Sequence, residues 1–65
     1  MAKTKEFYDI MAQFEKDGAK LFYGKRMDRE DKSEWNRQNY YQDGFVNLMF
    51  RSFLLGYQLH KSISN

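Results

Sequence analysis

The segment from Phe45 to Leu59 constrains the fold of this chain more than any other feature. Ten of its fifteen residues are apolar. A membrane span needs about 20 predominantly apolar residues, whereas this run is shorter and is interrupted by Asn47, Arg51, Ser52 and Gln58. Its phenylalanines would suit a strand, but leucine and methionine dominate the remainder and no turn signal divides it. We therefore expect a helix that does not cross a membrane.

On a helix that turns about 100° per residue, the apolar residues of this segment occupy two sides. The first side holds Phe45, Leu48, Met49, Leu55 and Leu59, together with the small residues Ser52 and Gly56. The second side holds Val46, Phe50, Phe53, Leu54 and Tyr57. One neighbouring helix can cover only one side, so we expect the first side to pack within the chain and the second to be an interface. The alternative is a three-helix arrangement that buries both.

A helix is predicted from about residue 5 to residue 23. Its apolar residues recur at three- and four-residue steps: Phe7, Ile10, Met11, Phe14, Leu21 and Phe22. Thr4 suits the N-cap position, where its hydroxyl can accept a backbone hydrogen bond. Gly24 suits the left-handed position that commonly follows the end of a helix.

A charged connector over residues 24–32 and a second helix over about residues 33–60 follow, with a frayed tail at residues 61–65. We expect the second helix to be kinked or continuous at Asp43-Gly44, and a break near Gly44 that gives three helices is the alternative. The predicted fold is therefore a single all-α domain over residues 1–65, arranged as a helical hairpin.

The size of the chain predicts that it associates. A domain of 65 residues buries only about 60% of the surface of its unfolded chain and is marginally stable without further support. The chain has no cysteine, which excludes disulfides and thiolate zinc sites, and its one histidine, His60, cannot form a zinc site alone. Self-association remains, and we expect a homo-oligomeric bundle, with a dimer as the first choice.

Charge and residue types argue against catalysis and against strong nucleic-acid binding. The net charge is +2, and residues 1–43 carry nine basic and nine acidic side chains. An uncompensated basic stripe is therefore absent from the sequence, which makes a nucleic-acid partner the weaker expectation. His60 has no acid among the sixteen residues before it to orient it. We expect no catalytic residue, metal or cofactor, and, because no signal-peptide pattern opens the sequence, a cytoplasmic protein.

The aromatic segment from Trp35 to Gly44 contains the remaining candidate contacts. Three rings stand near basic residues, and the set that could contact a ligand or partner is Trp35, Arg37, Tyr40, Tyr41, Lys25 and Arg26. Rings and cations of this kind can stack on bases and contact phosphates, so a small nucleic-acid- or nucleotide-binding module using residues 25–41 is the alternative function. Trp35 could instead pack in the core against Phe22 or Tyr23, with Tyr40 or Tyr41 at a surface or an interface.

The layout resembles that of short accessory proteins encoded by tailed bacteriophages. The features that carry this resemblance are Phe14-Glu15, a charged middle, Trp35, Tyr41, and a closing aromatic run of Phe50 and Phe53 near Gly56. At Phe53 the common pattern often has tryptophan. The resemblance implies a non-enzymatic protein that binds and inhibits a host protein or a host defence component, in the host cytoplasm. Together with the size argument, it predicts a self-associating protein-interaction module that binds a second protein.

Overall fold

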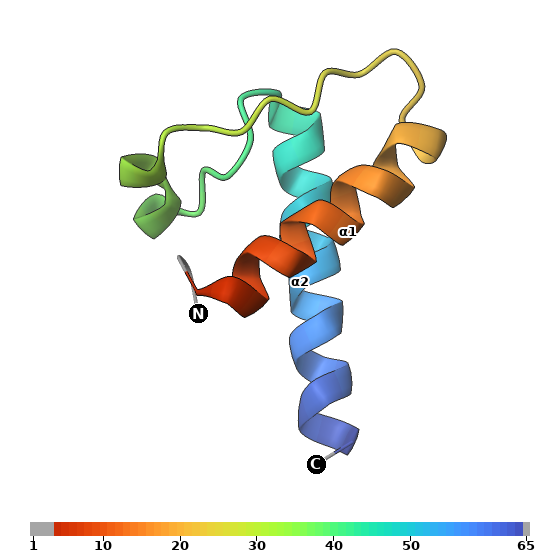
Figure 1. Cartoon of the computed structure of the whole chain (residues 1–65), viewed down its shortest axis with the longest axis vertical. Helices are drawn as coiled ribbons and strands as arrows, with labels where there is room; N and C mark the ends of the chain where they lie inside the picture. The colour runs from red at the N-terminus through yellow and green to blue at the C-terminus, as the bar shows by residue number, and fades with distance from the viewer. Residues whose placement is uncertain (1–3, 65) are drawn as a thin grey trace.

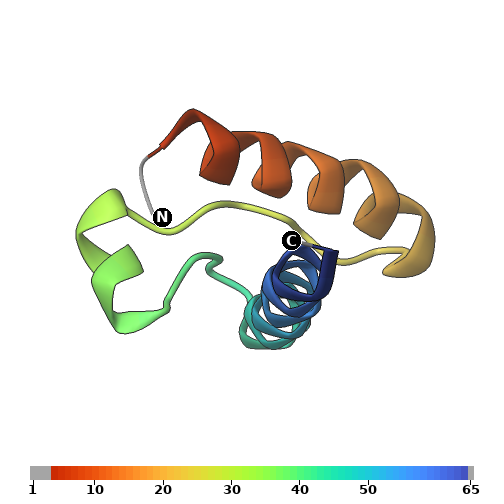
Figure 2. The ribbon, with the colours of Figure 1, turned by 90° about the horizontal axis from the view of Figure 1, so that it is seen from below.

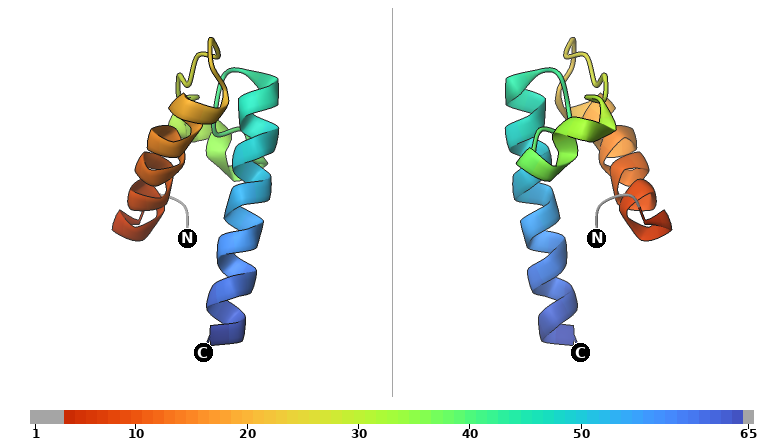
Figure 3. Two further views of the ribbon diagram at one scale, coloured as in Figure 1. Left: turned by 90° about the vertical axis from the view of Figure 1, so that its right-hand side faces the viewer. Right: turned by 90° about the vertical axis from the view of Figure 1, so that its left-hand side faces the viewer.

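The computed structural model describes residues 4–64, which form two α-helices and one short 3₁₀ helix, with no strand among them (Figure 1). They are α1 (Lys5–Leu21), η1 (Lys32–Arg37) and α2 (Gly44–Ser64). The predicted all-α class is confirmed. The two α-helices cross and then diverge instead of lying side by side along their lengths (Figures 1 and 3). Neither has the length and hydropathy needed to cross a bilayer.

Local signals set the ends of α1 much as predicted. The Thr4 hydroxyl oxygen accepts a hydrogen bond from the Phe7 backbone N–H at 3.2 Å, which caps the helix. The helix ends at Leu21, two residues earlier than expected. Gly24 then adopts a left-handed φ of 84°, a conformation that costs glycine little. From here on, the connector means all of residues 22–43, between α1 and α2.

The predicted helix over residues 33–60 is divided, and the preference for one helix was wrong. Asp31 caps η1 by accepting from the Ser33 N–H at 3.3 Å, and Gln38 ends it with a left-handed φ of 65°. A new N-cap at Asp43, whose carboxylate accepts from the Val46 N–H at 3.0 Å, then starts α2. The predicted frayed tail is also wrong over residues 61–64, which are helical, while Asn65 lies outside the described residues.

The side chain of Asn47 holds the non-helical segment between η1 and α2 in place. Its carbonyl oxygen accepts from the backbone N–H groups of Tyr40 at 2.7 Å and Tyr41 at 3.2 Å, and its amide donates to the Gln38 carbonyl at 3.0 Å. These bonds satisfy backbone groups that a continuous helix would have paired internally. Two further backbone hydrogen bonds join residues 28–30 to residues 40–42. The stretches before and after η1 therefore lie side by side, near the upper ends of the two α-helices (Figure 3).

The core is built around Phe50, which is fully buried. Its ring meets four other rings edge-on, at centroid distances of 5.1 Å to Phe14, 5.2 Å to Tyr40 and to Tyr41, and 5.9 Å to Phe7. Edge-to-face aromatic pairs at these distances add to the stabilisation that burial provides. The connector therefore contributes three buried side chains to the core, Trp35, Tyr40 and Tyr41, beside the four of α1.

The two sides of α2 are used in the opposite sense to the prediction. Of the residues expected to form the interface, three are buried in the core and two pack partly buried against it: Val46, Phe50 and Leu54, then Phe53 and Tyr57. The reason is that this side is covered twice, by α1 and by the rings of the connector. Of the large residues on the first side, Met49 packs partly buried against the core, and the others are exposed. The expectation that Val46, Phe50 and Leu54 face a partner is therefore wrong.

Candidate functional site: the outer face of α2

The side of α2 that points away from the rest of the chain carries a row of exposed apolar side chains. We call it the outer face, and its residues are Phe45, Leu48, Leu55, Leu59 and Ile63. Each is between 46% and 84% exposed. Seen nearly end-on, α2 has α1 and the connector on one side only (Figure 2). At about 100° per residue the five residues lie on the opposite side, so they form one continuous surface.

The outer face has no charged residue. The charged side chains of α2 are Arg51, which is on its flank, and Lys61, which turns towards α1. The Ser52 hydroxyl donates to the Leu48 carbonyl at 3.2 Å, so it is occupied within the helix. A methyl group placed on Gly56 would meet no atom of the chain within 4 Å, so packing within the chain does not require a glycine there. An uncharged apolar strip of this kind is typical of an interaction surface.

The upper end of the outer face is supported by the turn after α1. Phe45 packs edge-on against Phe22, with ring centroids 5.5 Å apart, and the Lys25 ammonium lies 5.3 Å from the Phe45 ring centroid. Lys25, a predicted ligand contact, therefore has an aromatic partner within the chain. This support holds the first turn of α2 in place.

The lower half of α2 extends beyond the crossing with α1 and is joined to it through Glu6 (Figure 3). One oxygen of the Glu6 carboxylate accepts from the Tyr57 hydroxyl at 2.7 Å and from the Lys61 ammonium at 2.8 Å. The hydrogen bond from Lys61, followed by that from Tyr57, lowers the pKa of Glu6 below its ordinary value. These contacts orient the helix end that presents Leu59 and Ile63.

The lowered pKa of Glu6 gives a pH dependence with a defined sign. Because the folded-state pKa lies below the unfolded one, Glu6 stabilises the fold above the unfolded value, and this contribution disappears as the pH falls through the folded value. We expect Glu6→Gln to lower the unfolding midpoint at pH 7. The difference from wild type should vanish only once the pH is beneath the folded-state pKa, which is itself lower than the ordinary carboxyl value of about 4.3. Thermal unfolding followed by circular dichroism, at pH 7 and at a pH well below about 4, measures this difference in midpoint. An equal difference at both would show that Glu6 acts without its charge.

The predicted aromatic contacts are buried and are not available for stacking on a ligand. Trp35, Tyr40 and Tyr41 all belong to the core. The Trp35 indole N–H donates to the Glu30 carbonyl at 3.0 Å, and its ring packs against Phe7 at 5.6 Å. The alternative for Trp35, a place in the core, is what the structure shows, although its ring neighbours Phe7 and Tyr8 are at the start of α1 and not at its end. The expectation that one of the two tyrosines lies at the surface was wrong.

A polar cluster also fixes Tyr41. Its hydroxyl donates to Glu15 at 2.8 Å, and the Arg29 guanidinium donates to both oxygens of the same carboxylate, at 2.6 and 3.2 Å. Burial, together with the hydrogen bond to Glu15, raises the pKa of the Tyr41 phenol. The paired Arg29 and Glu15 join the connector to α1, which makes this cluster a structural contact.

The basic residues of the predicted contact set are exposed, whereas its rings are buried in the core. Arg26 pairs with Asp28 at 2.8 Å, both largely exposed, and Arg37 is exposed at the end of η1. The structure therefore does not assemble the stacking surface that a nucleic-acid-binding module over residues 25–41 would need. Among residues 4–64, no three histidine or acidic side chains converge to hold a metal ion.

Sequence reasoning missed Ile63 and Arg51 as surface residues of interest. Ile63 lies four residues after Leu59 on the same side of the helix, a signal that the expected fraying after residue 60 concealed. Arg51 could have been noted as a cation inside an apolar run with no acid after Asp43. Comparison of the chain with protein-family models, with curated proteins and with solved structures gives no match.

Proposed function

We propose that the protein is a non-enzymatic protein-interaction module that forms a homodimer through the outer face of α2. The observation that carries this proposal is the uncharged row of five large apolar side chains along one side of the helix. Full burial of such a side chain stabilises by about 1.5–3 kcal/mol, and roughly half of that is available where a side chain is half exposed. Summed over two copies, this supports association at micromolar concentration.

A second copy of the chain fits this face for two reasons. A two-fold contact places the same surface on both subunits, and an uncharged apolar strip is complementary to itself without needing an opposite charge. A glycine inside a helix costs about 1 kcal/mol relative to alanine, yet the space around Gly56 is open within the chain. Close approach of a second helix at Gly56 and Ser52 would account for small residues there.

The second part of the proposal is that the dimer binds and modulates another protein. The resemblance to phage accessory proteins supports this part, since it implies inhibition of a host or defence protein in the host cytoplasm. A dimer that uses the outer face needs a second surface for such a partner.

The double substitution Leu55→Asp with Leu59→Asp tests the dimer. Four carboxylates would be brought into an apolar contact, so we expect size-exclusion chromatography at tens of micromolar to show a monomer that keeps the wild-type helical circular dichroism. Lys16→Gln, an exposed site on α1 that also makes the chain more negative, is the control and should elute with the wild type. Co-elution of the double variant with the wild type would place the contact elsewhere.

A further inference from the structure

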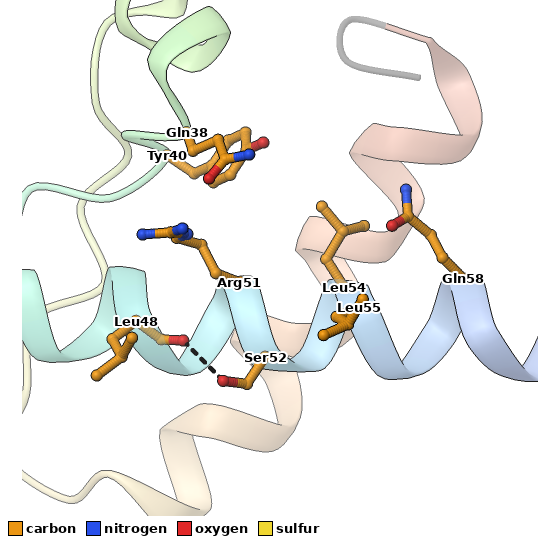
Figure 4. Close-up of a pocket in the computed structure, with 8 residues that line it drawn as sticks. All are labelled: Gln38, Tyr40, Leu48, Arg51, Ser52, Leu54, Leu55 and Gln58. Carbon is orange, nitrogen blue, oxygen red and sulfur yellow. Dashed lines mark hydrogen bonds between the residues drawn. The ribbon is translucent and has the colours of Figure 1, made fainter.

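A groove of about 340 Å³ runs along the flank of α2, between that helix and the residues that follow η1 (Figure 4). Leu54 and Leu55 provide its apolar wall, and Gln38 and Tyr40 face them from the connector. Arg51 extends from α2 towards Gln38 and Tyr40 (Figure 4). The groove therefore places one cation beside aliphatic and aromatic surface.

Arg51 has no counter-charge within the described chain. The ion pairs among residues 4–64 use Lys5, Arg26, Arg29 and Lys61, and none includes Arg51. Residues 44–65 contain two cations and no acid. Arginine presents a rigid fork of donors that matches a carboxylate through two parallel hydrogen bonds. An exposed guanidinium beside leucines is thus suited to a carboxylate that is itself flanked by apolar groups.

The helix of a second copy does not supply that carboxylate. The charged side chains of α2 are Arg51 and Lys61, so a second α2 laid in the groove would bring cation towards cation. Arg51 also lies roughly a quarter turn around the helix from the centre of the outer face, at about 100° per residue. The groove shares Leu48, Ser52 and Leu55 with the dimer surface, so a dimer would cover that part of its lining and leave the side with Arg51, Gln38 and Tyr40 open.

We propose that this groove binds an acidic, leucine-bearing peptide segment of a partner protein, with a carboxylate on Arg51 and an aliphatic side chain against Leu54 and Leu55. Charge complementarity carries this assignment. A nucleic acid is disfavoured because one cation among leucines and glutamines is not the basic stripe that a phosphate backbone needs. The assignment rests on the proposed function only in treating α2 as an interaction surface, and it does not require the dimer.

The test is a titration of the ¹⁵N-labelled full chain, followed by NMR, with a set of acetylated and amidated peptides that combine leucine with aspartate or glutamate. Matched peptides with asparagine or glutamine in place of the acids, and an oligothymidylate, are the comparison probes. We expect the acidic peptides alone to shift the Arg51 side-chain signal and the Gln38 amide. Arg51→Ala should weaken this binding about tenfold or more, and Arg51→Lys should weaken it less.

Arg37→Ala removes an exposed arginine outside the groove and should leave peptide affinity unchanged. Equal binding of the neutral peptides, an affinity insensitive to Arg51→Ala, displacement by the oligothymidylate, or the absence of any groove shift would each overturn the assignment. The mass of each sample in solution separates the two proposals. A chain that is monomeric at every concentration and binds acidic peptides contradicts the dimer alone. A chain that dimerises, but does not bind the peptides when diluted to the monomer, contradicts the groove assignment alone.

Discussion

Replacing Phe50 by alanine should leave most of the chain unfolded. A buried Phe→Ala change costs about 3–5 kcal/mol, because apolar burial is lost and a cavity remains. A core in a chain of this size rarely supplies more than about 3–5 kcal/mol in total. Phe50 is also the ring that joins α1 to the connector through Phe7, Phe14, Tyr40 and Tyr41. Circular dichroism at 25 °C and urea unfolding measure the effect.

Leu55→Ala is the matched control, since Leu55 lies on the outer face and is 57% exposed. At concentrations too low for association it should change the free energy of unfolding by less than about 1 kcal/mol. Phe50→Leu, which retains part of the volume, should give a folded chain of intermediate stability. The opposite order, with Leu55→Ala more damaging than Phe50→Ala in the monomer, would show that the two sides of α2 are wrongly assigned.

The second large effect is expected for Asn47→Ala. The Asn47 side chain makes three hydrogen bonds to the backbone of the segment after η1, and each such bond contributes about 0.5–1.5 kcal/mol. We expect a loss of about 2–3 kcal/mol in the free energy of unfolding. The amide protons of Tyr40 and Tyr41 should also exchange with solvent much faster. Urea unfolding and amide hydrogen exchange measure the two quantities.

Asn36→Ala, an exposed asparagine in η1, is the control and should change stability by no more than about 0.5 kcal/mol. Asn47→Asp keeps the acceptor for both N–H groups but loses the donor to Gln38, so it should fall between alanine and wild type. If the amide exchange rates of Tyr40 and Tyr41 are unchanged in Asn47→Ala, contacts other than those of Asn47 hold the non-helical segment between η1 and α2.

The parts of the fold that the sequence predicts well are those set by local chemistry. Thr4 as a cap, the spacing of Phe7, Ile10, Met11 and Phe14, and the left-handed Gly24 all act within a few residues of one another. Asp43 is a similar local signal, because an N-cap carboxylate at this point starts a new helix. The break before Gly44 also depends on contacts of Asn47 and of residues 28–30, which no local pattern reveals.

The reversal of the two sides of α2 has a different cause. Both sides carry large apolar residues in similar number, so periodicity shows that there are two faces without showing which one is covered. The choice depends on the connector, whose Trp35, Tyr40 and Tyr41 fold back onto the Phe50 side. Their position beside cations in the sequence predicts ligand contacts. In the fold they are core residues. The exposed surface, the outer face, lies on the side of α2 that was predicted to pack within the chain.

The mass of the wild-type chain in solution tests the central claim, self-association through the outer face, most directly. Static light scattering over a concentration series that reaches tens of micromolar should approach a mass of twice 7.9 kDa. The mass should fall towards 7.9 kDa on dilution, as a contact made of half-exposed side chains predicts. A constant mass of 7.9 kDa across the whole series would contradict the account.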